Sequence, residues 1–499
     1  MRIGLVLRSL LRPGRKARRL PLRPSKRRPT FGVEGLDSRL LLSTATMLSA
    51  TTVDSRGVTI SYDVTTPTAD PSLRFGVYRS AGPQLGPGAV PVAASLAAPA
   101  VDDSGGPADA PGVHRLTLPL AGGLPINPRH PYVLVVADPG SASAGQAGSV
   151  ASFRKESIAV VTHGGLEYSA WKKDGPPWER EMAQSLRQQG YDRVIAYNWV
   201  AQSSTPGQAA KQAPRLTAMV LDAASQFPAG NPVDLQFIGH SEGAVVNTQA
   251  IVRIEARATP RIKAGFLVDT LLDPHAANPD FPGRQYSVGG PLGWIAKLAI
   301  DNYQAKARDP LVFIPAGVNS AQVFYQQTAV NRDHNTNQGI YNIWGQVPVP
   351  GQATYYNLTA ADVVHSGKHG VYAWYEHHIV PTLGDGATQL AADAVSGTLA
   401  NPTKPGGRAI PAGPATFSGT SAPGSTVLLE AGRGQGRLRV EGRAVAAADG
   451  SWTATTGPLA AGRYRVVAES HLPGWNPKLG TMMPTAPLGA LDVGRGAKA

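Results

Sequence analysis

The sequence predicts an α/β protein, with a mostly parallel sheet covered by helices on both faces and a small all-β sandwich on each side of it. Between residues 153 and 395, apolar runs of strand length alternate with segments of helical spacing, as in parallel sheets. Residues 53–150 and 416–495 instead carry short alternating runs between turn residues, as in sandwiches. The composition agrees, since 56 glycines and 43 prolines among 499 residues indicate many loops and short strands.

The charge of the chain is concentrated in its first 40 residues. The formal net charge is +13, but residues 1–40 hold 12 basic and 2 acidic residues, which leaves 35 basic and 32 acidic residues elsewhere. The remainder is therefore close to neutral, and we expect no nucleic-acid partner. Because the sequence has no cysteine, disulfides and thiolate metal sites are excluded. No apolar run reaches 18 residues, so we expect no transmembrane segment.

Residues 1–52 are predicted to be a basic, largely disordered export segment. Their apolar patch is too short and broken for a standard signal peptide. The stretch GLDSRLLLS, residues 35–43, resembles the LEPR-XLL segment found near the N-terminus of many exported bacterial proteins. Asp37 and Ser38 stand where that segment usually has Glu and Pro. The resemblance implies export to the extracellular space or the cell surface.

The modules that follow are predicted in order along the chain. Residues 53–150 predict a sandwich of immunoglobulin or fibronectin type, ending in a flexible linker over residues 138–152. In the central region, residues 176–192 predict a helix that Gly190 ends, and residues 208–227 predict one that Pro214 interrupts. Residues 396–415 read as a Pro/Gly linker. Residues 416–495 resemble bacterial immunoglobulin-like repeats, which implies a surface or spacer module.

The strongest local signal is the sequence GHSEG, which runs from Gly239 to Gly243. It follows the apolar run 233–238 and precedes a segment of helical spacing, residues 244–257. A strand, G-x-S-x-G and a helix in this order predict a nucleophile elbow, a turn so tight that the residues flanking the serine must be small. Ser241 is therefore expected at the end of the strand, where helix N–H groups favour an oxyanion.

Residues 155–385 resemble the α/β-hydrolase fold, and within it the lipase branch. The motifs THGG, GHSEG, LLDPH and VVHSGKHGVYAWY carry this resemblance. It implies an acyl-transfer enzyme with Ser241 as nucleophile and with no metal and no organic cofactor. Such chemistry needs a histidine to take the serine proton and a carboxylate to orient the imidazole.

The sequence offers two candidates for the carboxylate and two for the histidine base. Asp273 lies in the LLDP context typical of pancreatic-type lipases and follows an apolar run, whereas Asp269 also fits a strand-end cap or a supporting group. His365 and His369 both precede the last predicted helix, and the leading position in the loop favours His365.

The motif positions also imply an oxyanion hole. Its donors would be the backbone N–H groups of Gly165 and Glu242, with His163 and Gly164 shaping the loop that holds Gly165. Residues 289–303 are amphipathic and predict either a lid or an ordinary covering helix.

The sequence thus predicts an exported serine hydrolase of lipase or esterase type. Its substrate would be an ester or lipid-like small molecule, and its sandwiches would contact the cell surface or a polymer. Two alternatives remain open. One is a serine peptidase or amidase on the same fold, and the other is a surface adhesion protein whose central domain is inactive.

Overall fold

The structure is a computed structural model. It describes residues 45–65, 73–137, 149–165, 174–274, 286–287, 309–326, 342–343, 345–347, 349–358, 363–367, 369–384, 396–399, 409–421, 423–433, 439–471 and 484–494.

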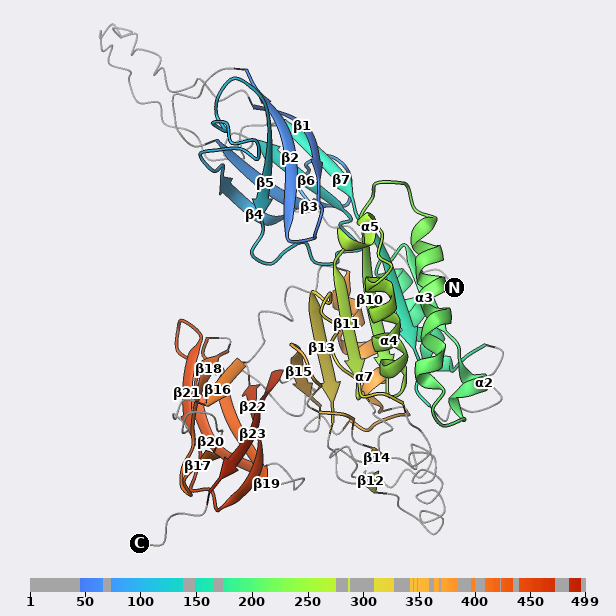
Figure 1. Ribbon diagram of the computed structural model, residues 1–499, viewed down its shortest axis with the longest axis vertical. Helices are drawn as coiled ribbons and strands as arrows, with labels where there is room; N and C mark the ends of the chain where they lie inside the picture. The colour runs from blue at the N-terminus through green and yellow to red at the C-terminus, as the bar shows by residue number, and fades with distance from the viewer. Residues whose placement is uncertain are drawn as a thin grey trace, which may run out of the picture. The chain divides into compact units, whose positions relative to one another are not determined.

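The first seven strands form two antiparallel sheets around one core (Figure 1). They are β1 (Ala45–Thr51), β2 (Gly57–Val64), β3 (Arg74–Ser80), β4 (Val90–Ala97), β5 (Gly112–Pro119), β6 (Tyr132–Ala137) and β7 (Val150–Arg154). The sheet orders are β1-β2-β5 and β4-β3-β6-β7, and Ile60, Phe75 and Val135 are fully buried in the shared core. Because β1 lies within residues 1–52, the first sheet begins earlier in the chain than the predicted boundary at residue 53.

Six strands of the central region are parallel. In spatial order they are β15 (Thr354–Asn357), β13 (Ser320–Tyr325), β11 (Leu267–Leu272), β10 (Val233–His240), β8 (Glu156–Thr162) and β9 (Arg193–Tyr197). The helices are α1 (Pro177–Gln188), α2 (Val200–Ser203), α3 (Ala209–Ser225), α4 (Gly243–Glu255), α5 (Pro260–Lys263), α7 (Val371–His378) and α8 (Val380–Leu383). Strands β12 (Tyr286–Ser287) and β14 (Asn342–Ile343) form a separate antiparallel pair.

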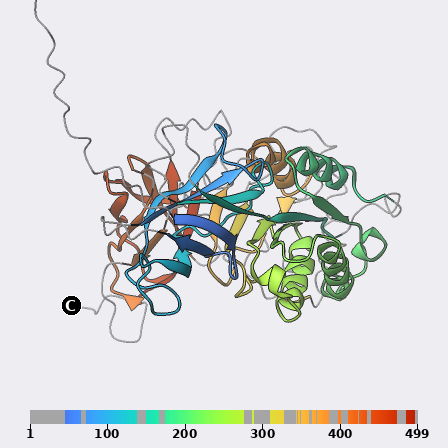
Figure 2. The same cartoon turned by 90° about the horizontal axis from the view of Figure 1, so that it is seen from above.

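Successive residues of these buried strands enter two different core clusters, as the two-residue period of a strand requires. In β8, Ile158 and Val160 pack with α3 and α4, whereas Ala159 and Val161 pack with α1 and α7. Helices α3 and α4 lie side by side in both views (Figures 1 and 2). Helix α3 continues through Pro214, which the sequence predicted to interrupt it, and buried residues on both sides of Pro214 pack against the strands.

The remaining strands are antiparallel, apart from the short β17. They are β16 (Ser396–Leu399), β17 (Ala409–Ile410), β18 (Thr416–Thr420), β19 (Thr426–Arg433), β20 (Arg439–Val445), β21 (Ser451–Thr455), β22 (Gly462–His471) and β23 (Pro484–Val493). One sheet has the order β16-β18-β21, and strands β20-β19-β22-β23 follow one another in a second. Strands β16 and β17 lie within the predicted linker, residues 396–415.

The predicted fold class, an α/β-hydrolase-type sheet with two separate flanking sandwiches, is wrong. Strands make up 42% of the structure and helices 20%, and several of the sheets are small and antiparallel. The parallel strands also do not end at β15, because β23 pairs with it antiparallel and joins it to the C-terminal strands. An apolar run predicts a strand but not its partner, and the exposed edge of a strand is a ready site for further pairing. The sheet therefore continues from the central strands into the C-terminal ones.

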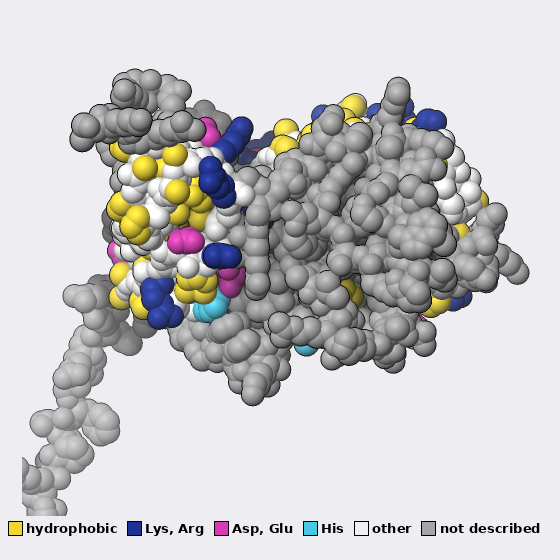
Figure 3. Space-filling model, turned by 90° about the horizontal axis from the view of Figure 1, so that it is seen from below, with side chains coloured by type: hydrophobic (Ala, Val, Ile, Leu, Met, Phe, Trp, Pro, Cys, Tyr) yellow, Lys and Arg dark blue, Asp and Glu magenta, His cyan; other side chains and the backbone are white. Residues whose placement is uncertain are grey.

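The surface of the described residues is mixed in character. On the face in Figure 3, basic, acidic and hydrophobic side chains lie among one another rather than in separate fields. Within the described ranges, no helix has the length and apolar character needed to cross a bilayer.

Candidate active site

The register of the parallel strands brings four chain segments to one edge of the sheet. His240, the last residue of β10, pairs with Leu272, the last residue of β11, and Leu272 pairs in turn with Phe324 near the end of β13. Gly239 pairs with Thr162, the last residue of β8. Because the carboxyl ends of parallel strands meet at one edge, the residues that follow these strands are neighbours in space.

Ser241 occupies the tight turn between β10 and α4. Its φ is +54°, which is uncommon for a residue with a side chain and strained in this kind of turn. A Cβ on Gly243 would lie 2.3 Å from the carbonyl oxygen of Thr162, and one on Gly239 would lie 2.8 Å from Ala244 Cα. Neither position therefore has room for a side chain. This agrees with the small residues that a nucleophile elbow requires beside its serine.

A continuous hydrogen-bond chain joins Ser241, His365 and Asp273. His365 Nε2 lies 3.1 Å from Ser241 Oγ, and His365 Nδ1 lies 2.7 Å from Asp273 Oδ2. Since a carboxylate oxygen accepts, Nδ1 carries the proton and Nε2 is left to face the serine hydroxyl. The three residues are 4%, 5% and 0% exposed, so these bonds lie in a water-poor environment. This arrangement allows the imidazole to take the serine proton while the carboxylate stabilises the charge formed.

Two further donors hold Asp273. Gln326 Nε2 donates to Oδ2 at 2.9 Å, and the backbone N–H of Gly345 donates to Oδ1 at 2.9 Å. Asp273 itself has a φ of +45°, and a Cβ on Gly345 would lie 2.6 Å from its Oδ1. The carboxylate is thus fixed by contacts on both oxygens, and it directs one of them at His365.

The two alternatives that the sequence left open lie elsewhere. Asp269 sits in the middle of β11 opposite Phe237, where burial raises the pKa of its carboxyl to about 8. Within the described ranges, its Oδ2 has no hydrogen-bond partner. His369 is exposed, and its backbone carbonyl accepts a hydrogen bond from the N–H of Val364. The structure therefore brings Asp273 and His365 to Ser241, and neither Asp269 nor His369.

The segment after β8 lies against the elbow. A Cβ on Gly164 would lie 2.8 Å from Ser241 Cβ, so this glycine permits the close approach. His163 is fully buried: its Nδ1 donates to the carbonyl of Gly164 at 2.9 Å, and its Nε2 accepts from the N–H of Trp199 at 3.0 Å. Burial lowers the pKa of His163 to about 4, so this imidazole is neutral at pH 7. Its role in this geometry is to fix the loop.

The two predicted oxyanion donors are next to residues of the elbow in sequence: Gly165 follows Gly164, which approaches Ser241, and Glu242 follows Ser241 itself. Gly165 is the last described residue of the segment after β8. Glu242 directly follows Ser241 and is the N-cap of α4, so its peptide lies at the positive end of the helix dipole.

His240 has a contact that the sequence did not predict. Its Nε2 donates to the backbone carbonyl of His365 at 2.8 Å, and the two rings lie 4.8 Å apart. Trp178 and Tyr372, stacked with ring centroids 4.3 Å apart, both meet the His240 ring edge-on. His240 thereby ties the loop of His365 to the end of β10.

Sequence reasoning missed Gln326, Gly345 and this role of His240. Gln326 had a usable signal, because it is a polar residue directly after the apolar run of β13. Gly345 had none, since its importance depends on Asp273, which is 72 residues away in the sequence. The predicted lid, residues 289–303, lies outside the described residues.

Comparisons with known proteins leave the family open. No protein-family model and no curated protein matches the chain. Among solved structures, a β-glucuronidase from Bacteroides uniformis is 11% identical over 91% of this chain and 64% of its own, with a TM-score of 0.19. Phospholipase PlaB from Legionella pneumophila is 10% identical over 63% of this chain and 85% of its own, with a TM-score of 0.30. The chitinase ChiW from a Paenibacillus species is 11% identical over 93% of this chain and 52% of its own, with a TM-score of 0.19.

These three neighbours are enzymes, but likeness at such TM-scores carries no argument about fold or activity. The chain also spans less than two thirds of the glucuronidase and about half of the chitinase.

Proposed function

We propose that this protein is a serine hydrolase that cleaves carboxylic esters through an acyl-enzyme. The observation that carries the proposal is the hydrogen-bond chain from Ser241 Oγ through His365 to Asp273. A serine hydroxyl is a weak nucleophile, and it becomes effective when an adjacent base removes its proton. The strained turn and the buried, doubly anchored carboxylate further support a reactive serine rather than a structural one.

In the acylation step, Ser241 Oγ attacks the ester carbonyl carbon while His365 Nε2 takes the hydroxyl proton. The imidazolium that forms keeps the proton on Nδ1 and donates it in a hydrogen bond to Asp273, whose negative charge favours the charged ring. The negative charge on the former carbonyl oxygen would be met by the backbone N–H groups of Glu242 and Gly165, each contributing about 3 kcal/mol to the lowering of the barrier. The C–O bond then breaks, and His365 donates its proton to the departing alcohol.

The second half of the reaction repeats these roles with water. His365 Nε2 takes a proton from a water molecule, whose oxygen attacks the acyl carbon. The bond between the acyl carbon and Ser241 Oγ then breaks. Ser241 Oγ takes the proton back from His365 Nε2, and the carboxylic acid leaves. All of these proton transfers pass through the one ring nitrogen that faces the serine.

Turnover of p-nitrophenyl esters by the Ser241→Ala variant tests this proposal. Loss of the nucleophile is expected to lower kcat on the order of 10⁶-fold, with the unfolding midpoint unchanged. Chain-length-matched esters and amides, assayed side by side, distinguish an esterase from an amidase. Unchanged ester turnover in Ser241→Ala would contradict the proposal.

Export is also part of the proposal. It is supported by the basic N-terminal segment and by residues 35–43, which lie outside the described residues. Cell fractionation tests it directly, because an exported protein should be absent from the cytoplasmic fraction.

A further inference from the structure

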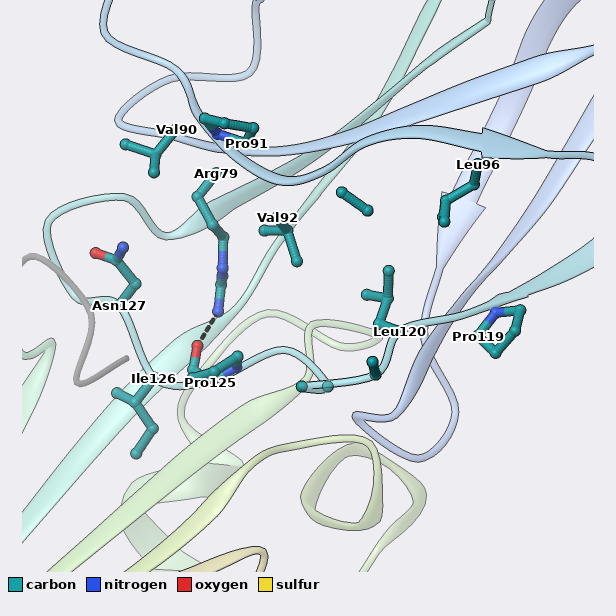
Figure 4. Close-up of a pocket in the computed structure, with 14 residues that line it drawn as sticks. Arg79, Val90, Pro91, Val92, Leu96, Pro119, Leu120, Pro125, Ile126 and Asn127 are labelled. Carbon is teal, nitrogen blue, oxygen red and sulfur yellow. Dashed lines mark hydrogen bonds between the residues drawn. The ribbon is translucent and has the colours of Figure 1, made fainter. Parts of the chain in front are cut away.

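The N-terminal strands line a cavity, and all of its residues lie between Arg79 and Asn127, before the central strand β8 begins at Glu156. It has a volume of about 370 Å³ and lies between β3, β4 and the segment 119–127. Figure 4 shows the side chains around it. Most are apolar, and they include Val92, Leu96, Leu120 and Ile126. A cavity of this size and lining is within the range of small-molecule sites.

Arg79 is the charged side chain of this mostly apolar lining, and Asn127 is a polar one. Arg79, on β3, is 3% exposed, and its guanidinium reaches across to the carbonyl of Pro125, to which Nη2 donates (Figure 4). Its Nη1 has no hydrogen-bond partner among the residues that the structure describes. A buried guanidinium normally uses its donors, because an unmet donor on a charged group is costly to bury. Arg79 thus has the capacity to bind a further acceptor.

The charges around Arg79 are also unequal. Lys155 is buried, and its Nζ lies 2.8 Å from Asp234 Oδ1 and donates to the carbonyl of Leu124 at 2.7 Å. Among the described residues, Asp234 is the one carboxylate with an electrostatic interaction with both cations. Its Oδ1 also accepts a hydrogen bond from the backbone N–H of Phe266. Burial lowers the pKa of Lys155 to about 8, so this side chain is mostly cationic at pH 7. Burial also lowers the pKa of Arg79. A guanidinium nevertheless stays protonated in proteins, so Arg79 is the second cation. Two buried cations therefore share one carboxylate.

We propose that this cavity binds a small apolar carboxylate, of the class of a medium-chain fatty acid, with its anionic end beside Arg79 and its alkyl chain against Val92, Leu96 and Leu120. A monoanion would balance the second cation, and an alkyl chain matches the apolar lining. A neutral apolar ligand would leave the charge unbalanced. An inorganic anion would leave the apolar lining unfilled. The proposal does not rest on hydrolysis at Ser241, which belongs to different elements.

Calorimetric titration of the full-length Ser241→Ala protein with octanoate tests this site without turnover. Octanoate is expected to bind, and octanol and octylamine of equal chain length are expected to bind at least 10-fold more weakly. Arg79→Met should weaken octanoate binding at least 10-fold. Arg74→Met is the matched control, because Arg74 lies on the same strand but is exposed, and it should leave binding unchanged.

A second variant keeps the test decisive if Arg79→Met does not fold. Val92→Trp fills the cavity from a half-buried position on β4 and leaves Arg79 in place, so octanoate binding should be lost. Absence of octanoate binding to the parent protein, equal binding of octanol, or full binding by Val92→Trp would each overturn the proposal. Full binding by that variant would place octanoate elsewhere, including at the elbow.

Discussion

At the scale of single residues, identical side-chain types have very different environments. Asp269 and Asp273 are four positions apart, both are buried, and the sequence left the choice between them open. Asp273 follows the end of β11 and receives hydrogen bonds on both oxygens. Asp269 lies within the strand, and its register partners on the two adjacent strands are the apolar residues Phe237 and Ala321. The position relative to the end of β11 therefore decides which of the two aspartates can reach His365.

Replacing each of these two acids by the isosteric amide should affect catalysis very differently. Asp273→Asn removes the charge that fixes the His365 tautomer, so kcat for ester hydrolysis should fall on the order of 10⁴-fold. Asp269→Asn should change kcat by less than about threefold, because it contacts neither His365 nor Ser241. Steady-state kinetics on one p-nitrophenyl ester compares the pair. A larger loss in Asp269→Asn than in Asp273→Asn would contradict the assignment.

Asp269 should also make stability depend on pH. Its pKa is about 8 in the folded chain against 3.8 in the unfolded one, so between these values only the folded state holds the proton. Folding then takes up a proton, and the free energy of unfolding should fall as pH rises from about 4 to 8.

Denaturant midpoints measured across this pH range test the linkage. The midpoint of Asp269→Asn relative to wild type should rise steadily between pH 4 and pH 8, because the amide does not titrate. The control is Glu181→Gln on the exposed side of α1, which should show no such trend. A constant difference between Asp269→Asn and wild type would mean that Asp269 titrates normally.

At the scale of elements, the site is built from the ends of β8, β10, β11 and β13 and from the segment after β15, which carries His365. The elbow could be predicted from sequence, because a glycine at 239 is required by the turn itself, where Ala244 lies too close for a side chain. Gln326 and Gly345 could not be placed, because their partner, Asp273, is distant in sequence and the pairing depends on strand register. Local sequence patterns thus predict the candidate site residues, whereas contacts between residues distant in sequence determine which of these candidates lie together in the site.

Gly243→Ala tests the steric account of the elbow. The added Cβ would lie 2.3 Å from the carbonyl oxygen of Thr162 and 2.6 Å from that of His163, so the backbone must move. We expect a stability loss of about 1–3 kcal/mol and a large loss of kcat, because the loop carrying Gly164 is displaced. Gly86→Ala, where a Cβ would meet nothing within 4 Å, should change neither the thermal midpoint nor kcat. Wild-type activity in Gly243→Ala would show that the turn is not tightly packed.

At the scale of the whole molecule, the modules are more continuous than the sequence suggested. Strand β7 closes the N-terminal four-stranded sheet at Arg154, and β8 of the central sheet begins at Glu156. Only Lys155 separates them, and its ion pair with Asp234 of β10 fixes this junction. At the other end, β23 pairs with β15. Composition predicted strand-rich modules at both ends, but the sheet that joins them depends on pairing that composition does not encode.

Covalent labelling with a fluorophosphonate, followed by peptide mass spectrometry, tests the central claim most directly. The reagent reacts with a serine only where a neighbouring base activates its hydroxyl. Our account predicts a single adduct on Ser241 in the wild-type protein, a strongly reduced rate of labelling in His365→Ala, and an undiminished rate in His369→Ala. An unlabelled Ser241 in folded wild-type protein, or labelling that is unaffected by His365→Ala, would contradict it.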